Sequence, residues 1–524
     1  MVTVLLLAAL LAGVVVLTPL ADRWRVPLPV LLTLFGLLVA LLPGARPVQI
    51  APDLILPVVL PPLLFAATQR TTARDFRENA RAIVLLAVGL TVVTTGAVAL
   101  VAHAMGVPWG AAVVLGAVVA PPDPVAATAV ARRLRLPGRL VTVLEGEGMF
   151  NDATALVLYK VSVAAVVAGG LSGGALVRSL VLAVGVGVGL GLAAGVLTRA
   201  ALARLHLAAP ETTVTLAVPF LAYLLADRLD GSGVLAVLTL GLYLRTYGHD
   251  ALTSGGWLLG RAVWRYADYV VTSMVFVLIG FELTAVLRAE PLDARSVWLA
   301  LAVCGALVAV RFAWLFPVAR LSRPRLRGPA RTGPVGSRET LIAAWAGMRG
   351  VVTVATALAL PAVTAAGAAF PARRTVVFVG LVAVLVTLVI QGLTLAPLVR
   401  HLGVGTDVDV TAEARSLRRR ATAAALETLR GSPDDEVPER VRRAVTLQYE
   451  GYLAAQDALG TARKGAADDQ ADDGDERAVD DLLRQATEVE REVVIEARRR
   501  GQVSAEAADE VLDDVESRAV RDTG

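Results

Sequence analysis

The segment "VLGAVVAPPDPVAATAV", residues 114–130, is an apolar run that is interrupted at its centre by Pro121, Pro122 and Pro124 around Asp123. Each proline removes a backbone donor and clashes with the preceding turn, so a helix must break near the aspartate. Broken backbone at membrane depth is tolerated only where it is buried in protein or lines a wet cavity. The break also leaves carbonyl oxygens beside a carboxylate, which suits a monovalent cation. A proline kink that only shapes packing is the alternative, and three prolines flanking an aspartate disfavour it.

The composition places this segment in a membrane protein. The chain has 524 residues, is 56% hydrophobic and has a mean hydropathy of +0.65. Its apolar runs are long enough to cross a hydrocarbon core about 30 Å thick as helices. Barrel strands would be shorter and would alternate apolar with polar residues. The single Cys304 excludes an intrachain disulfide and a CxxC metal site. The sequence therefore predicts an all-α polytopic membrane protein, in which the first apolar run is a retained helix.

Hydropathy predicts thirteen spans before residue 400. With the spans bounded as given below, loops after odd-numbered spans hold 18 Lys and Arg, whereas loops after even-numbered spans hold five. The positive-inside rule then places the amino terminus outside and the carboxyl-terminal part in the cytoplasm. The predicted spans cover residues 2–20, 26–42, 50–67, 82–103, 108–131, 141–167, 174–200, 211–226, 231–247, 266–288, 296–317, 338–360 and 375–399.

Two triplets of spans, the fourth to sixth and the eleventh to thirteenth, both have an interrupted middle member. In the second triplet this member is "AAWAGMRGVVTVATALAL", residues 343–360. The triplets begin at even and odd positions, so they run in opposite directions through the membrane. Inverted repeats whose broken helices meet near the bilayer midplane have this pattern.

The part of the chain after residue 400 is different in character. Residues 401–524 carry 18 basic and 29 acidic side chains, whereas residues 1–400 carry 32 and 17. We expect residues 1–400 to form the membrane domain. We expect residues 401–524 to form a tail of two or three amphipathic helices with a flexible acidic joint near residues 464–476. This tail is either a regulatory module or a solvated appendage.

A second polar segment, "GEGMFNDATA" at residues 146–155, lies within the sixth span. Glu147 and Asn151 are four residues apart and share a helix face, and Asp152 lies about 100° round the helix from Asn151. A charged side chain at the centre of a membrane helix costs about 2.5 to 3.5 kcal/mol. These acids therefore need partners, protons or water.

The deepest cation is Arg349, between Gly347 and Gly350, and it is the natural partner for a buried acid. We expect such a pair to hold the structure together rather than to bind the transported ion, because either charge alone would be stranded. Arg311 and Glu282 also lie within spans. They form a second pair or extend toward the membrane interfaces.

These motifs resemble those of the Na+/H+ exchanger family, the monovalent cation/proton antiporters that include bacterial NhaP and Nhe proteins. The resemblance covers residues 1–400. It implies an NhaA-like antiporter fold, with a dimerisation domain, a core domain with crossed broken helices, and a homodimeric assembly. It rests on "LPPLLFAA" in the third span, "PPDPVA" in the fifth, "GEGMFNDATALVLY" in the sixth and "GMRGVVTVATALALP" in the twelfth.

The resemblance also implies roles for individual residues. Asp152 would be the carboxylate that binds either the cation or the proton, and Asn151 would brace the broken helices. Asp123 would help to compensate the crossing and lie close to the ion. Glu147 would pair with Arg349. Family members with Asn at the position of Asn151 resemble electroneutral exchangers, which favours electroneutral exchange here.

Three positions depart from the family pattern. Ala66 stands where an acid is common, Gly148 where Ser is common, and Pro122 where Thr often precedes the aspartate. Pro122 still offers its carbonyl as an ion ligand beside Asp123 and Asp152. The other two changes remove candidate oxygen ligands, for which Gln69, Thr154 or water are the possible substitutes.

The sequence therefore predicts a Na+/H+ antiporter of the plasma membrane that acts by alternating access, with Na+ or K+ and H+ as substrates and no cofactor. K+/H+ antiport is the alternative within the family, and a cation channel is a weaker one. A hydrolase is disfavoured because the chain has no HExxH, no GxSxG with triad candidates and no cysteine cluster. The basic residues of the predicted membrane domain lie in short loops between spans, and this pattern indicates membrane topology and not nucleic-acid binding.

Overall fold

The computed structural model divides the chain into two compact units, residues 1–406 and 407–524. The predicted boundary at residue 400 lies six residues earlier. The structure describes the chain except residues 1, 25, 43–51, 70–83, 124–126, 128–130, 132–135, 170–172, 249–250, 290–292, 323–335, 405–418, 421, 428–429, 431–438, 469–488, 490–492, 494–516 and 518–524.

The first unit is helical throughout its described length, apart from turns and short connections. Its helices are α1 (Val2–Trp24), α2 (Leu28–Leu41), α3 (Pro52–Thr68), the π-helix η1 (Leu85–Leu90), α5 (Thr91–Ala104), α6 (Trp109–Val119), α8 (Gly138–Val167), α9 (Gly173–Leu202), α10 (Ala208–Arg228), α11 (Gly233–Tyr247), α12 (Ser254–Ala289), α13 (Ala294–Ser322), α14 (Ser337–Trp345), α15 (Val351–Leu358) and α16 (Arg373–Leu402).

These helices confirm the all-α membrane class. Within the described residues, seven helical segments are long and apolar enough to cross a membrane, and four shorter apolar helices accompany them. Every predicted span overlaps a helix. One difference is α12, which begins at Ser254, twelve residues before the predicted span. Hydropathy misses this first part because Arg261 and Arg265 interrupt its apolar pattern.

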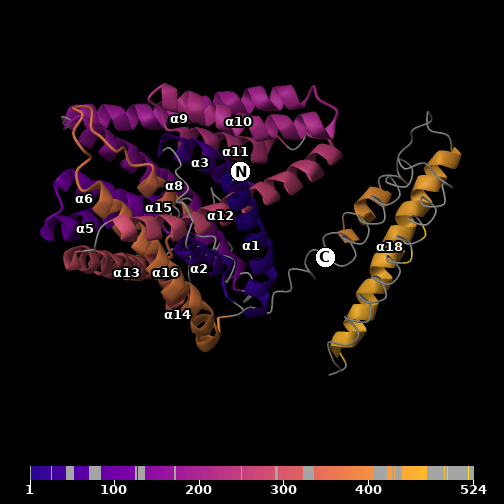
Figure 1. Ribbon diagram of the computed structural model, residues 1–524. Helices are drawn as coiled ribbons and strands as arrows, with labels where there is room; N and C mark the ends of the chain where they lie inside the picture. Colours follow the sequence, from indigo (N-terminus) through magenta and orange to yellow (C-terminus); the bar gives the residue numbers. More distant parts are fainter. Residues whose placement is uncertain are drawn as a thin grey trace. The chain divides into compact units, whose positions relative to one another are not determined.

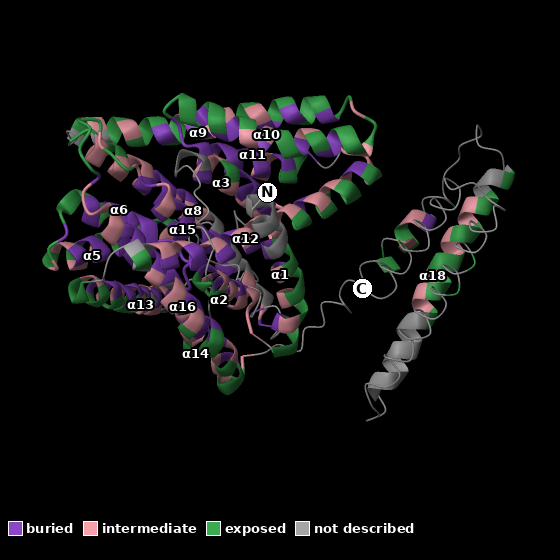
Figure 2. Ribbon diagram, viewed as in Figure 1, coloured by how far each residue is buried: buried purple, intermediate pink, exposed green. Residues whose placement is uncertain are grey.

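The helices of this unit form two groups with separate cores. In one group α9, α10 and α11 lie side by side and pack with α3 and part of α12 (Figure 1). In the other, α5, α6, α13 and α16 pack together, and α15 lies against α6 and α16. Buried residues concentrate in the second group, whereas α9 and α10 carry many exposed apolar side chains (Figure 2). An exposed apolar surface of this kind suits contact with lipid.

The second unit contains α18 (Glu439–Asp468). Arg419 and Arg430 form exposed ion pairs with Asp457 and Glu450 of this helix. The hydrogen bond from Arg419 holds the pKa of Asp457 below its usual value. Residues 464–468, the first part of the predicted flexible joint at residues 464–476, belong to α18. The rest of the predicted joint lies outside the described residues.

Candidate functional site: the crossing of two broken helices

Two helices break at the positions that the sequence predicts, and the two breaks meet. The segment after α6 reaches the non-helical residues 346–350 between α14 and α15. There the backbone N–H of Asp123 donates to the carbonyl of Met348 at 2.6 Å. The Asp123 carboxylate in turn accepts a 3.3 Å bond from the backbone N–H of Val351, the first residue of α15. Backbone groups that the breaks release therefore find partners across the crossing.

Two charged side chains at the crossing compensate the dipoles of α15 and α6, the helices that begin and end at the breaks. Asp123 lies at the amino-terminal end of α15, where the helix dipole is positive. Arg349 is 2% exposed, and its Nε donates to the carbonyl of Val119 at the carboxyl-terminal end of α6 at 2.7 Å. The guanidinium also donates to the Gly347 carbonyl at 2.5 Å, and the backbone N–H of Arg349 donates to the Thr387 hydroxyl at 3.0 Å. A carboxylate and a guanidinium thus compensate opposite helix ends.

The close approach of the two breaks depends on Gly350. A Cβ atom at this position would lie 1.6 Å from Oδ2 of Asp123. Any other residue would therefore push the carboxylate away from α15. Gly347 is similarly restricted, because its Cβ would lie 2.5 Å from Cδ of Arg311.

Glu147 pairs with Arg311 and not with Arg349. Two bonds of 2.5 and 3.0 Å join the guanidinium of Arg311, on α13, to the two carboxylate oxygens of Glu147, on α8. Arg311 also donates two bonds to the Ala343 carbonyl. The predicted Glu147–Arg349 pair is therefore wrong, because the broken helices supply the carbonyl acceptors of Arg349. The alternatives for Arg311, a pair with Glu282 or an interfacial position, are also wrong: the guanidinium is 4% exposed and bound to Glu147.

Asn151 and Asp152 follow one turn after Glu147 on α8. Asn151 is fully buried, and its Nδ2 lies 3.4 Å from the Pro122 carbonyl, a long hydrogen bond. Its Oδ1 has no hydrogen-bond partner among the described residues. Asp152 is half-buried and lies near enough to Asp123 for their charges to repel. No Lys, Arg or His in the described part of the chain forms an ion pair with Asp152.

The structure locates two positions that depart from the family pattern and the two side chains that are candidate substitute ligands. Ala66 and Gly148 are buried. The hydroxyl of Thr154, a possible substitute ligand, donates to the carbonyl of Phe150 at 3.0 Å. Gln69, the other candidate, lines a cavity between α3, α11 and α12.

Several polar residues around the site were not predicted. Thr387 accepts from Arg349, and Thr353, on α15, is 1% exposed with a hydroxyl that has no partner among the described residues. Threonine is common in apolar helices, so the sequence offers no signal for either. Glu211, on α10, is fully buried and accepts two bonds from Thr253, at 3.1 and 3.0 Å.

Comparisons with known proteins agree with this geometry. The family model for the sodium/hydrogen exchanger transmembrane region matches residues 6–401. An uncharacterized Na+/H+ exchanger of Mycobacterium tuberculosis is 38% identical over 431 residues, which cover 81% of this chain and 79% of the relative. A sodium, potassium, lithium and rubidium/H+ antiporter of Bacillus pumilus is 27% identical, covering 78% of this chain and 63% of the relative.

A solved structure shares the fold. The sodium proton antiporter MjNhaP1 of Methanocaldococcus jannaschii superposes with a TM-score of 0.58 at 18% identity, covering 78% of this chain and all of that chain. With crossed broken helices, the acids of α8 beside them and a family model that matches three quarters of its length, the chain belongs to the sodium/hydrogen exchanger family.

Proposed function

We propose that this chain exchanges Na+ for H+ across the membrane and that Asp152 is the carboxylate at which the two ions compete. The observation that carries the proposal is the position of Asp152 beside the helix crossing, near Asp123 and next to the buried Asn151. Glu147, on the same helix, is neutralised by Arg311. Asp152 has no such cation among the described residues, which leaves it available to a transported one.

The proposed cation site combines side-chain and backbone oxygens. Asp152 supplies the ionised carboxylate, and Asp123 supplies negative charge close to it while it holds the amino-terminal end of α15. The carbonyl of Pro122 has two lone pairs, of which the Asn151 amide takes at most one. Asn151 fixes this carbonyl with respect to α8. Carboxylate and carbonyl oxygens are the ligands that hard cations prefer.

Exchange follows from competition at one group. A cation on Asp152 favours the ionised carboxylate, and a proton removes the charge that holds the cation. The empty ionised site would carry an uncompensated charge through an apolar region, which is unfavourable. Movement of the site between the two sides then occurs only with one ion or the other bound. Asn151 carries no charge, and this supports electroneutral exchange.

The orientation and assembly are parts of the same proposal. The arginine-rich loops support a cytoplasmic location for the carboxyl-terminal unit and an external amino terminus, in the plasma membrane. The resemblance to exchangers supports a homodimer. A regulatory role for residues 407–524 would be in keeping with a separate compact unit.

K+/H+ exchange is the second candidate. The relative from Bacillus pumilus carries potassium in its name, and Ala66 and Gly148 leave fewer oxygen side chains to distinguish the two cations. Proteoliposomes that contain an internal pH dye, with Na+, K+ or Li+ added in turn, separate the two by the cation that drives proton flux. A clamped voltage in the same assay shows whether exchange is electroneutral.

The test of the site uses Asp152→Asn in this assay. We expect a folded protein without cation-dependent proton flux. Asp293→Asn is the matched control, because it makes the same chemical change at an exposed residue before α13, and it should retain full flux. Full flux in Asp152→Asn would contradict the proposed role of this carboxylate.

A further inference from the structure

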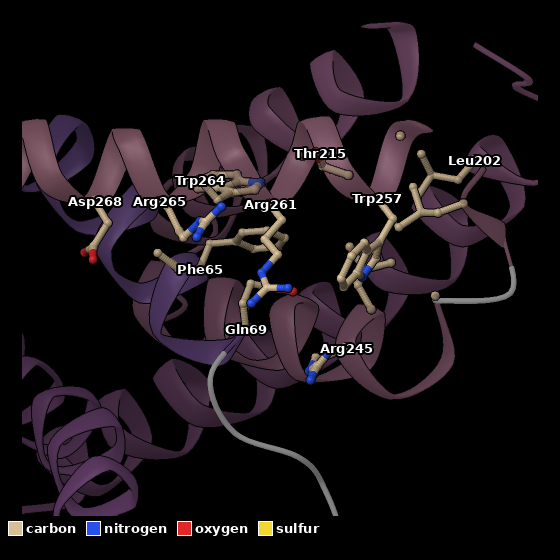
Figure 3. A pocket seen from close by; sticks show the side chains of 16 residues that line it. Phe65, Gln69, Leu202, Thr215, Arg245, Trp257, Arg261, Trp264, Arg265 and Asp268 are labelled. Atoms are coloured by element: carbon tan, nitrogen blue, oxygen red, sulfur yellow. The ribbon is translucent and has the colours of Figure 1, made fainter. Parts of the chain in front are cut away.

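A cavity of about 720 Å³ lies between α3, α10, α11 and α12, at their ends near the connection from α11 to α12 (Figure 3). None of its lining residues belongs to α6, α8, α14 or α15, whereas Ala66 and Gln69, discussed above as positions of candidate cation ligands, do line it. The positive-inside rule places the α11–α12 connection on the cytoplasmic side. The cavity thus lies where α12 begins, in the segment that hydropathy misses.

The cavity is basic. Arg261 and Arg265 project from α12, and Arg245 comes from the last turn of α11 (Figure 3). The guanidinium of Arg261 lies 5.2 Å from the centre of the Trp257 ring, a cation–π contact that fixes its position. Asp268 also lines the cavity. No carboxylate of the described residues forms an ion pair with any of the three arginines.

A buried donor in the same wall has no acceptor. Trp264 is 6% exposed and stacks against Phe65, with ring centres 4.5 Å apart. Its indole Nε1 has no hydrogen-bond partner among the described residues. A buried N–H group is almost always paired, so one without a protein acceptor in a cavity wall indicates that the acceptor comes from a ligand or water. The Trp264 indole N–H and the guanidinium groups all donate hydrogen bonds, so a ligand in this cavity would have to supply acceptors.

We propose that this cavity binds a phosphate-bearing anion, either the headgroup of an anionic phospholipid or a soluble phosphate. The planar guanidinium group forms paired hydrogen bonds with phosphate oxygens, and three arginines that carry this group line the cavity. Basic pockets between membrane helices on the cytoplasmic side suit lipid headgroups, and 720 Å³ is ample for one. Trp264 supplies a neutral donor to the same oxygens.

The test is a binding measurement on the full chain, stripped of lipid in an uncharged detergent. Inorganic phosphate and short-chain phosphatidylglycerol are titrated separately, with short-chain phosphatidylcholine as the zwitterionic control, and binding is followed by thermophoresis. The variants are Arg261→Gln, Arg265→Gln and Trp264→Phe. Arg204→Gln is the matched control, because this exposed arginine follows α9 on the same predicted side but does not line the cavity.

We expect saturable binding that each cavity arginine variant weakens by about ten- to hundredfold, since hydrogen bonds to charged groups are worth about 1.5 to 3 kcal/mol. Trp264→Phe should weaken it by a smaller factor, and Arg204→Gln should leave it unchanged. Binding of both probes supports the shared phosphate chemistry. Binding of phosphatidylglycerol alone identifies a lipid headgroup, and binding of inorganic phosphate alone identifies a soluble ligand. No saturable binding, or equal weakening in Arg204→Gln, would overturn the proposal.

Discussion

The pairing of Glu147 with Arg311 makes a prediction that a double-mutant cycle can measure. The pair is buried, bidentate and joined by bonds of 2.5 and 3.0 Å. Removing one partner of a buried pair costs about 3 to 5 kcal/mol, because the other charge is left without compensation. Glu147→Gln and Arg311→Met should each destabilise the protein by about this amount. The double variant should lose far less than the sum, since it leaves no buried charge of this pair unmatched.

The assay is the unfolding of the purified protein in detergent, followed by tryptophan fluorescence. We expect a coupling free energy of at least about 2 kcal/mol between Glu147 and Arg311. The matched comparison is Arg349→Met in place of Arg311→Met. Arg349 donates to the carbonyls of Val119 and Gly347, so its coupling to Glu147 should be clearly smaller. A larger coupling between Glu147 and Arg349 would refute the observed pairing.

Three further predictions concern the crossing and the tail. Gly350→Ala should abolish transport while the protein still inserts, because its Cβ displaces the Asp123 carboxylate; retained flux would show that the contact is dispensable. Thr387→Val should lower unfolding stability by about 1 to 3 kcal/mol, as it leaves the buried N–H of Arg349 without an acceptor, whereas Thr213→Val, at an exposed site, should have little effect. The pKa of Asp457 is lowered in the folded state, so its ion pair stabilises α18 above the unfolded pKa and is lost as pH falls through the folded one. Hydrogen exchange of α18 in the full chain, corrected for intrinsic rates, should show less protection in acid, and unchanged protection would contradict this contribution.

The sequence predicts the helix breaks well because their causes are local. Three prolines around Asp123 and the glycines beside Arg349 interrupt apolar runs, and the structure breaks both helices there. These breaks depend on residue type and spacing and need no knowledge of how the helices pack. The position of Asn151 and Asp152 beside the crossing was implied by the resemblance to the exchanger family and not by their spacing.

The partner of Glu147 could not be predicted because it depends on packing. Two buried arginines, Arg311 and Arg349, are available, and only the arrangement of α13 and the broken helices decides between them. The first part of α12 was missed for a different reason. Its arginines line a cavity instead of facing lipid, so that the predicted span begins only after them.

The most direct test of the central claim is the dependence of Na+ affinity on pH in proteoliposomes. If Na+ and H+ compete for Asp152, the apparent KM for Na+ should rise as the pH on the same side falls, up to about tenfold per pH unit below the pKa of the site, with the maximal rate unchanged. A KM for Na+ that stays constant while acid lowers only the maximal rate would show that the two ions bind at different groups, and would contradict exchange at a single carboxylate.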